Sequence, residues 1–378
     1  MPDGVAGPGQ AQGIAGPIPA DALGLVLPHE HILFDTSPWL LPAPPAKAWL
    51  TDAPVALDTY AEVFRDPLVC RDNLVFLDDD VAVDELERFR EAGGGTIVDV
   101  TPPAMGRDVA RVRRIAERSG VQVVVGTGHY VQSTHPPEVA RQSVDEIAAW
   151  MIGEIRDGID DTGIRPGVIG EIGTSGAIHP DERKCLEAAA LTQQETGLAI
   201  TVHCAIPTEK VGLDVVRVLE RAGADPTRVI LGHMSHTVAD LDYHRACADT
   251  GAVLEYDRFG AEFLYESWGR YEEPRDSTVV AAVARLVADG YGDRIVLSHD
   301  ACYRVQLARF GGGGYAHLAR HVLPALGDAG VDEAALRRLT VETPARLLAI
   351  REDARTSRDV RTEGARDEVA APVAKEGR

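Results

Sequence analysis

The chain has 378 residues, of which 45% are hydrophobic and 26% charged, so it is long enough for a single α/β barrel, which needs about 250 residues. Its formal net charge of −21 at pH 7 argues against nucleic-acid binding, which needs clustered lysine and arginine, and against docking on an anionic membrane. No stretch approaches about 18 consecutive apolar residues, so no membrane-spanning helix is expected.

The two ends of the chain are expected to lie outside the folded domain. Residues 1–17 are rich in Gly, Ala and Pro and lack the basic start and apolar core of a signal peptide, so we expect them to be flexible. Residues 351–378 are polar and mixed in charge, which predicts a disordered tail. The cysteines are scattered without CxxC spacing, which predicts reduced thiols and a cytoplasmic location. They are Cys70, Cys185, Cys204, Cys247 and Cys302.

Between these ends, residues 18–350 alternate short apolar runs with helical patterns, which predicts one domain with a (β/α)8 TIM barrel. Near-continuous apolar runs are typical of parallel strands that are covered on both faces. The predicted strands are 24–31, 96–101, 121–128, 167–173, 199–204, 229–234, 252–257 and 294–299. A doubly wound open sheet is the alternative, and it is disfavoured because no glycine-rich phosphate turn follows the first strand.

Residues 35–80 form a long insertion after the first strand, with several prolines and aromatic residues. A loop of this length inside a compact domain is usually functional. Because it follows a strand, we expect it to lie over the catalytic face of the barrel. It is either a lid or a lineage-specific surface insertion.

Six potential metal ligands each stand near the end of a predicted strand. They are His29, His31, Glu171, His203, His233 and Asp300. Side chains two positions apart on a strand share a face, so both imidazoles of the HEH motif can point into the barrel. The next two histidines are 30 residues apart, one β/α unit, and should lie on neighbouring strands. Each histidine alone would be read as a core residue, but the set indicates a metal site at the barrel mouth.

The two carboxylates of this set, Glu171 and Asp300, would be costly to bury without a partner. A bound cation removes that cost, and an ion pair with Arg or Lys is the alternative. Six ligands exceed the needs of one tetrahedral zinc ion and suit two divalent ions about 4 Å apart that share a bridging hydroxide. Asp300 could take the proton of that water and pass it to the leaving group, so we assign it the catalytic role.

The motifs LPHEH, GVIGEIGTS, TVHC, LGHMSH, LEYDRFG, LSHDA and FGGGGYAHL together resemble the phosphotriesterase-related family of the amidohydrolase superfamily. The resemblance covers roughly residues 17–350 and is stronger to the phosphotriesterase-related proteins than to the organophosphate-degrading enzymes. It implies that His29, His31 and Asp300 hold one ion, that His203 and His233 hold the other, and that Glu171 bridges them. Many relatives have a carboxylated lysine at the bridging position, so assembly here should not depend on carbon dioxide. The family also implies a homodimer.

Substrate contacts are expected from loops that follow the strands. Tyr130 follows the third strand, where relatives often have an aromatic residue, and Arg304 could meet an anionic substrate group. Asp257 and Arg258 follow the seventh strand, and an ordinary loop role is equally compatible with them. His236 stands where several relatives have an acidic proton-relay residue; it either replaces that residue or is a partly exposed histidine. The glycine run at 311–314 is expected to be a flexible loop that closes on the site.

The leading functional hypothesis is a binuclear metal-dependent hydrolase that cleaves a carboxylic ester, lactone or N-acyl amide bond of a small molecule. Zn²⁺ is the expected ion, and Mn²⁺ or Co²⁺ suits the same ligands. The alternatives are a phosphotriester hydrolase and a non-catalytic metal- or ligand-binding protein on the same fold. The complete ligand set favours an enzyme over the last of these.

Overall fold

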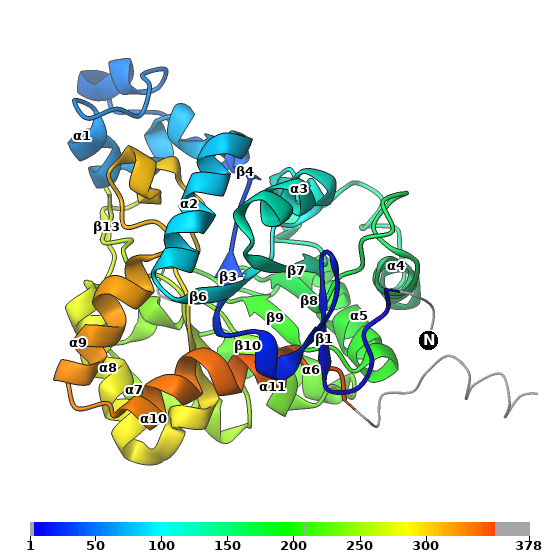
Figure 1. Ribbon diagram of the computed structural model, residues 1–378. Helices are drawn as coiled ribbons and strands as arrows, with labels where there is room; N and C mark the ends of the chain where they lie inside the picture. Colours follow the sequence, from blue (N-terminus) through cyan, green and yellow to red (C-terminus); the bar gives the residue numbers. More distant parts are fainter. Residues whose placement is uncertain (1–3, 208, 352–378) are drawn as a thin grey trace, which may run out of the picture.

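The protein is described here by a computed structural model over residues 4–207 and 209–351. Across these residues, eight parallel strands form a nearly closed barrel in sequential order, surrounded by helices (Figure 1). The strands are β3 (Leu25–Glu30), β6 (Gly94–Asp99), β7 (Gln122–Thr127), β8 (Val168–Gly173), β9 (Ile200–His203), β10 (Val229–Leu231), β11 (Val253–Tyr256) and β14 (Ile295–Leu297). This order confirms the predicted (β/α)8 barrel and excludes a doubly wound sheet, in which the strand order reverses.

The first and last barrel strands meet through Ser298. Its hydroxyl accepts from the amide of His29 at 3.1 Å and lies 2.9 Å from the carbonyl oxygen of the same residue. The amide of Asp300 also donates to the carbonyl of His29, at 3.1 Å. The barrel therefore closes at two of the candidate ligands.

The outer layer consists of helices whose ends are set by local sequence. The helix α4 begins with a capping box, in which Ser143 Oγ accepts from the amide of Glu146 at 3.2 Å and the Glu146 carboxylate accepts from the amide of Ser143 at 2.8 Å. The helices are α1 (Tyr60–Arg65), α2 (Asp79–Glu91), α3 (Val109–Ser119), α4 (Val144–Asp157), α5 (Pro180–Thr196), α6 (Gly212–Arg221), α7 (Leu241–Asp249), α8 (Asp276–Leu286), α9 (Leu323–Asp328), α10 (Glu333–Arg337) and α11 (Thr343–Leu348). None of the described helices is long and apolar enough to cross a bilayer.

The expectation of a flexible segment at residues 1–17 is wrong for its second half. A hairpin of β1 (Gln10–Gly13) and β2 (Gly16–Pro19) packs on the barrel, and Ala11 is fully buried. The amide of Ile14 donates to the carbonyl of Val123 at 2.7 Å. Small residues give no hydrophobic pattern, yet they allow the backbone to approach the strands closely. The predicted tail at 351–378 lies outside the described residues except for Arg351.

The insertion at residues 35–80 contributes α1 and the short antiparallel pair β4 (Phe34–Asp35) and β5 (Val75–Phe76). Its buried side chains, among them Leu50 and Val69, form one hydrophobic cluster with residues of the loops after β11 and β14, such as Phe263 and Tyr303. In Figure 1, α1 lies beside the segment that carries β12 (Leu264–Tyr265) and β13 (Tyr271–Glu272). The insertion thus covers the carboxyl end of the barrel, as the sequence predicts.

Candidate metal centre and active site

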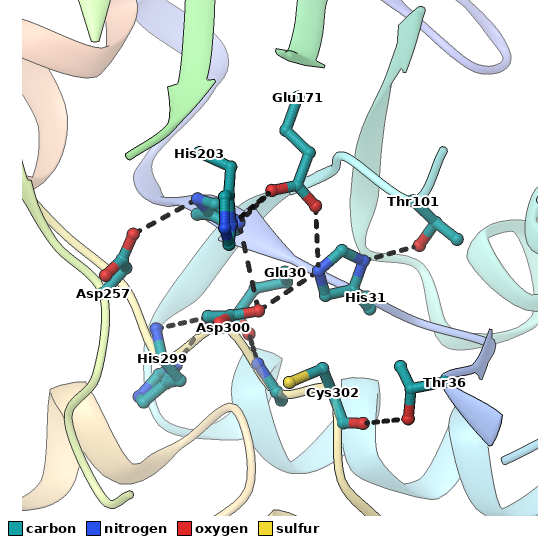
Figure 2. A network of polar contacts seen from close by, with 12 residues as sticks. Glu30, His31, Thr36, Thr101, Glu171, His203, Asp257, His299, Asp300 and Cys302 are labelled. Atoms are coloured by element: carbon teal, nitrogen blue, oxygen red, sulfur yellow. Dashed lines mark hydrogen bonds and ion pairs between the residues drawn. The ribbon is translucent and has the colours of Figure 1, made fainter. Parts of the chain in front are cut away.

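All six predicted ligands converge at the carboxyl end of the barrel, and all are buried. Figure 2 shows Glu171, His31, His203 and Asp300 pointing toward one another from separate elements. One ligand atom from each of His29, His31 and Asp300 lies within 4.8 Å of the other two, and the same holds for Glu171, His203 and His233. The carboxyl ends of parallel strands meet at one face of a barrel, which is why residues so distant in sequence come together here.

The two histidines of β3 are oriented by partners behind their rings. Nδ1 of His31 lies 2.9 Å from Oγ1 of Thr101, and Nδ1 of His29 lies 3.0 Å from Oε2 of Glu255. Each Nε2 atom then faces the centre of the cluster. Such partners fix the tautomer and the direction of a ligating imidazole. Glu255, on β11, was not anticipated from the sequence because it looks like an interruption of an apolar strand.

Glu171 lies between the two histidine groups. Its Oε1 is 3.5 Å from Nε2 of His31, while its Oε2 is 3.6 Å from both Nε2 of His29 and Nδ1 of His203. Burial alone would raise the pKa of Glu171, but hydrogen bonding from His203 and His29 outweighs it and lowers the pKa to about 2. The carboxylate is therefore ionised and within reach of ligands from both groups.

His203 and His233 form the other side of the cluster. Nε2 of His233 lies 2.6 Å from Nδ1 of His203. His233 adopts a left-handed backbone conformation, with φ of 61°. Asp257 stabilises this conformation: its Oδ2 accepts from the amide of His233 at 2.9 Å and lies 3.1 Å from the Nδ1 of the ring. Asp257 also lies 3.3 Å from Nδ1 of His29, so it orients a histidine of each group.

Asp300 faces both the ligand cluster and a buried arginine. Its Oδ1 lies 3.1 Å from Nε2 of His31, and its Oδ2 accepts from Nη1 of Arg258 at 2.5 Å. Burial would raise the pKa of Asp300, but the charge of Arg258 and the hydrogen bond from His31 hold it well below its usual range. Arg258 also donates to Glu273 at 2.9 Å and is only 4% exposed.

Another buried carboxylate, Glu30, holds the backbone on either side of Asp300 (Figure 2). Its Oε1 accepts from Ser298 Oγ at 2.8 Å and from both the amide and Nδ1 of His299, at 2.9 and 2.7 Å. Its Oε2 accepts from the amide of Ala301 at 3.0 Å. Glu30 stands between the two histidines of the HEH motif and points to the opposite side of the strand.

The donor set fits divalent cations. Two atoms of the cluster that face its centre are buried without a hydrogen-bond partner among the described residues: Nε2 of His29 and Oε2 of Glu171. Buried polar atoms normally find partners, so such orphaned atoms need an explanation. Imidazole nitrogens together with carboxylate oxygens are the ligands that zinc and similar ions prefer.

A cavity of about 400 Å³ opens above the cluster, with His31, Glu171, His203, His233 and Asp300 in its lining. The insertion contributes apolar walls through residues such as Trp39 and Leu68. Tyr130, for which the sequence predicts a substrate contact, also lines the cavity. Its hydroxyl lies 2.9 Å from Nδ1 of His203, and its ring meets Trp39 edge-on with 5.5 Å between centroids.

The expected substrate contact of Arg304 needs correction. Its guanidinium donates to the carbonyl of Val75 at 2.7 Å, pairs with Asp72 at 3.3 Å and lies over the ring of Phe310. It is not among the described residues that line the cavity. Arg304 therefore anchors the insertion, and Arg258 is the arginine at the site. The sequence placed both arginines after strands but did not show which one faces inward.

The interpretation of His236 as a partly exposed histidine is also wrong. The residue is buried, and its Nδ1 lies 2.7 Å from the hydroxyl of Tyr271. Burial, reinforced by the nearby charge of Arg258, lowers its pKa well below the ordinary histidine value. It is absent from the described lining of the cavity, so a proton relay through it has no direct route to a bound molecule.

The glycine run at 311–314 does not close on the cavity either. The buried carboxylate of Glu85 in α2 holds the preceding turn, accepting from the amides of Ala308 at 3.0 Å and Arg309 at 2.7 Å. Tyr315, directly after the run, donates its hydroxyl to the carbonyl of His31 at 2.8 Å. The segment supports the first barrel strand from behind, and none of its glycines lines the cavity.

Replacing Gly314 by alanine is expected to lower the free energy of unfolding by about 2–4 kcal/mol, combining left-handed strain with overpacking. Gly314 has φ of 59°, and a Cβ there would lie 2.4 Å from Oε2 of Glu85. Gly330 has φ of 92° with open space around it, so Gly330→Ala measures the strain alone. Urea unfolding of both variants checks this. Equal losses in the two variants would show that a methyl group at position 314 does not clash with Glu85.

Comparison with known proteins agrees with the geometry. The chain matches the model of the Phosphotriesterase family over residues 9–348. It is 34% identical over 349 residues to an N-acetyltaurine hydrolase of Tetraodon nigroviridis, covering 91% of this chain and 99% of that protein. It is 31% identical over 345 residues to the N-acetyltaurine hydrolase of Homo sapiens, with the same coverages.

Two solved structures are similar over most of their length. A resiniferatoxin-binding protein from Rhodobacter sphaeroides shares 39% identity with a TM-score of 0.88, covering 90% of this chain and 95% of that one. A phosphotriesterase homology protein from Escherichia coli, complexed with phosphate in its active site, shares 28% identity with a TM-score of 0.70, covering 87% and 99%.

The barrel, the buried ligand set and these relatives define a hydrolase of the metal-dependent class. Within that class, the chain belongs to the phosphotriesterase family.

Proposed function

We propose that the protein hydrolyses an N-acyl amide, carboxylic ester or lactone of a small molecule at a centre of two divalent cations, with Zn²⁺ preferred over Mn²⁺ or Co²⁺. His29, His31 and Asp300 would hold one cation, and His203 and His233 the other, with Glu171 between them. The observation that carries this proposal is the convergence of six buried ligands, five of which line the floor of the cavity. The names of the curated relatives support an amide as the bond that is cleaved.

Cations held there would lower the pKa of water and polarise the bond under attack. The residues of the chain supply the rest. Asp300, held by Arg258 and close to His31, would accept a proton from water and return it to the departing nitrogen or oxygen. The bond from the acyl carbon to that atom breaks, the oxygen of water joins the acyl carbon, and a carboxylate and an amine or alcohol leave. Tyr130 borders the same space.

Replacing His203 by alanine should lower kcat at least about a hundredfold, because this removes one candidate ligand without disturbing the barrel. Steady-state turnover of the metal-loaded variant, together with its circular dichroism spectrum and its bound-metal content, measures this. The matched control is His321→Ala, which replaces an exposed histidine outside the cavity. Unchanged turnover in a folded His203→Ala variant would remove the basis of the proposal.

A substrate panel identifies the bond. N-acyl amino acids, N-acyl taurines, lactones, aryl esters and one phosphotriester are each tested with metal-loaded protein and with a chelator-treated control. We expect chelator-sensitive hydrolysis of an amide, ester or lactone. Dominant phosphotriester cleavage would favour the alternative hydrolase, and tight binding of metal without hydrolysis of any compound would favour a binding protein on this fold.

Two finer features are also proposed. The family resemblance favours a homodimer, which light scattering coupled to size-exclusion chromatography tests. All five cysteines are buried and unpaired, which supports a reducing compartment such as the cytoplasm. A single domain spanning residues 18–350 stays a prediction, and the packed β1 and β2 hairpin argues for starting any shortened version of the chain before residue 10.

A further inference from the structure

The walls of the cavity are apolar where they are formed by the insertion. Pro38, Trp39, Leu40, Leu41 and Leu68 all face the cavity, and Trp268 joins them from the loop after β12. The ligand cluster is at the floor, so the group of the substrate that lies away from the reacting bond meets these walls. Burying a charged group against such surface is unfavourable unless hydrogen-bond donors or opposite charges are available.

Among the described residues that line the cavity, no cationic side chain is unpaired. Arg258 is the only lysine or arginine among the described residues that line it. One terminal nitrogen of Arg258 donates to Asp300 at 2.5 Å and the other to Glu273 at 2.9 Å. Its Nε has no hydrogen-bond partner among the described residues, but this atom is buried and not accessible from the cavity. Two carboxylates thus already face the single positive charge, and the guanidinium presents no free edge to a bound anion.

The threonine and serine hydroxyls of the described lining are also committed. Thr36 Oγ1 donates to the carbonyl of Leu74 at 2.9 Å, and Thr174 Oγ1 donates to the carbonyl of His203 at 2.8 Å. Ser175 Oγ donates to the carboxylate of Glu182 at 2.6 Å. A hydroxyl has one proton to donate, so these side chains have none left for a sulfonate or carboxylate.

Three backbone amides of the lining have acceptors as well. The amide of Leu41 donates to the carbonyl of Leu68 at 2.8 Å, and that of Thr174 donates to the carbonyl of His203 at 3.0 Å. The amide of Ser175 donates to Glu182 at 3.0 Å. A compact anion-binding nest needs several free amides aimed at one point, and these amides already have acceptors.

We propose that the protein prefers substrates in which the group that lies away from the cleaved bond is uncharged and apolar. It therefore discriminates against amides of anionic amines such as taurine, in which this group is a sulfonate. This rests on the proposed function and narrows its substrate class. It separates this chain from the activity that the names of its curated relatives suggest. Glu273 sets the selectivity by occupying Arg258.

The test uses three amides with one acyl group, octanoyl, joined to propylamine, ethanolamine or taurine. With metal-loaded protein, kcat/KM for the propylamide is expected to exceed that for the taurine amide at least about tenfold, with the ethanolamide between them. A taurine amide that is cleaved as well as the propylamide would overturn the proposal, even though hydrolysis itself would be established.

Calorimetric titration of the same compounds separates this proposal from the proposed function. If these amides are not cleaved, and the ester and lactone of the substrate panel are not cleaved either, the proposed function fails, while the selectivity is still measured as the ratio of Kd values on the metal-loaded protein. We expect Kd of the taurine amide to be at least about tenfold higher than that of the propylamide. Equal affinities, or no binding of either compound, would overturn the selectivity.

Replacing Glu273 by glutamine leaves Arg258 with one carboxylate and is expected to narrow the gap between the two amides at least about threefold. The control is Glu272→Gln, which changes an exposed neighbour and should leave the ratio unchanged. If Glu273→Gln does not fold, the comparison of the three amides on the unaltered protein still tests the selectivity. A folded Glu273→Gln variant with an unchanged ratio would exclude Glu273 as the determinant.

Discussion

Replacing Asp300 by asparagine should reduce kcat by about 10²–10⁴-fold, the contribution typical of a positioned proton acceptor. Asparagine keeps the shape of the side chain, so the hydrogen bond to Arg258 can be kept in part. It cannot accept a proton at its amide nitrogen or supply the negative charge that faces His31 at 3.1 Å. Steady-state turnover of the reconstituted variant measures the loss, and elemental analysis of bound metal shows whether a cation was lost with it.

The matched control for this experiment is Asp293→Asn, which alters an exposed aspartate just before β14. It should retain the turnover of the unaltered protein. If Asp300→Asn instead keeps kcat within about twofold while holding its metal, another group accepts the proton, and the catalytic assignment of Asp300 is wrong.

Replacing Glu30 by alanine is expected to lower the free energy of unfolding by at least about 3 kcal/mol, because several buried donors lose their acceptor at about 1–3 kcal/mol each. Glu30 accepts from Ser298, from both nitrogens of His299 that face it and from Ala301. Glu30→Gln should lower the free energy of unfolding less, because the amide oxygen of glutamine replaces one of the two acceptor atoms. Part of the loss remains, because the amide nitrogen of glutamine faces a donor. Chemical unfolding of both variants measures which of them has the lower free energy of unfolding.

Glu272→Ala is the control for this series, since Glu272 is exposed and on a short strand of a loop. Its unfolding free energy should change by less than about 0.5 kcal/mol. If Glu30→Ala were as stable as this control, solvent must replace the lost acceptors, and Glu30 would not be what fixes the backbone beside Asp300.

The eight barrel strands could be predicted because each is an apolar run covered on both faces, and such runs remain visible without any knowledge of their partners. The meeting of His29, Glu171 and Asp300 then follows from topology alone, since parallel strands bring their carboxyl ends together. Whether these residues hold metal stays a prediction from their chemistry.

The contacts behind the ligands could not be predicted in the same way. Alternation along β3 places Glu30 on the side opposite to its neighbouring histidines, which indicates a buried carboxylate but not its partners. Those partners lie 268 to 271 positions away in the chain. Likewise, Arg258 faces the site because Glu273 receives it, and Glu273 follows β13, a strand of only two residues that no apolar run marks.

The joining of β3 to β14 by Ser298 has a consequence for how the protein is made. The candidate cation site draws on residues from both strands, so a chain still emerging from the ribosome cannot complete it until residue 300 has docked. Contacts between such distant segments form late because closing the intervening loop is entropically costly. Metal uptake would then report the final step of folding, and cation supply during synthesis would determine the yield of the native protein without changing the early steps.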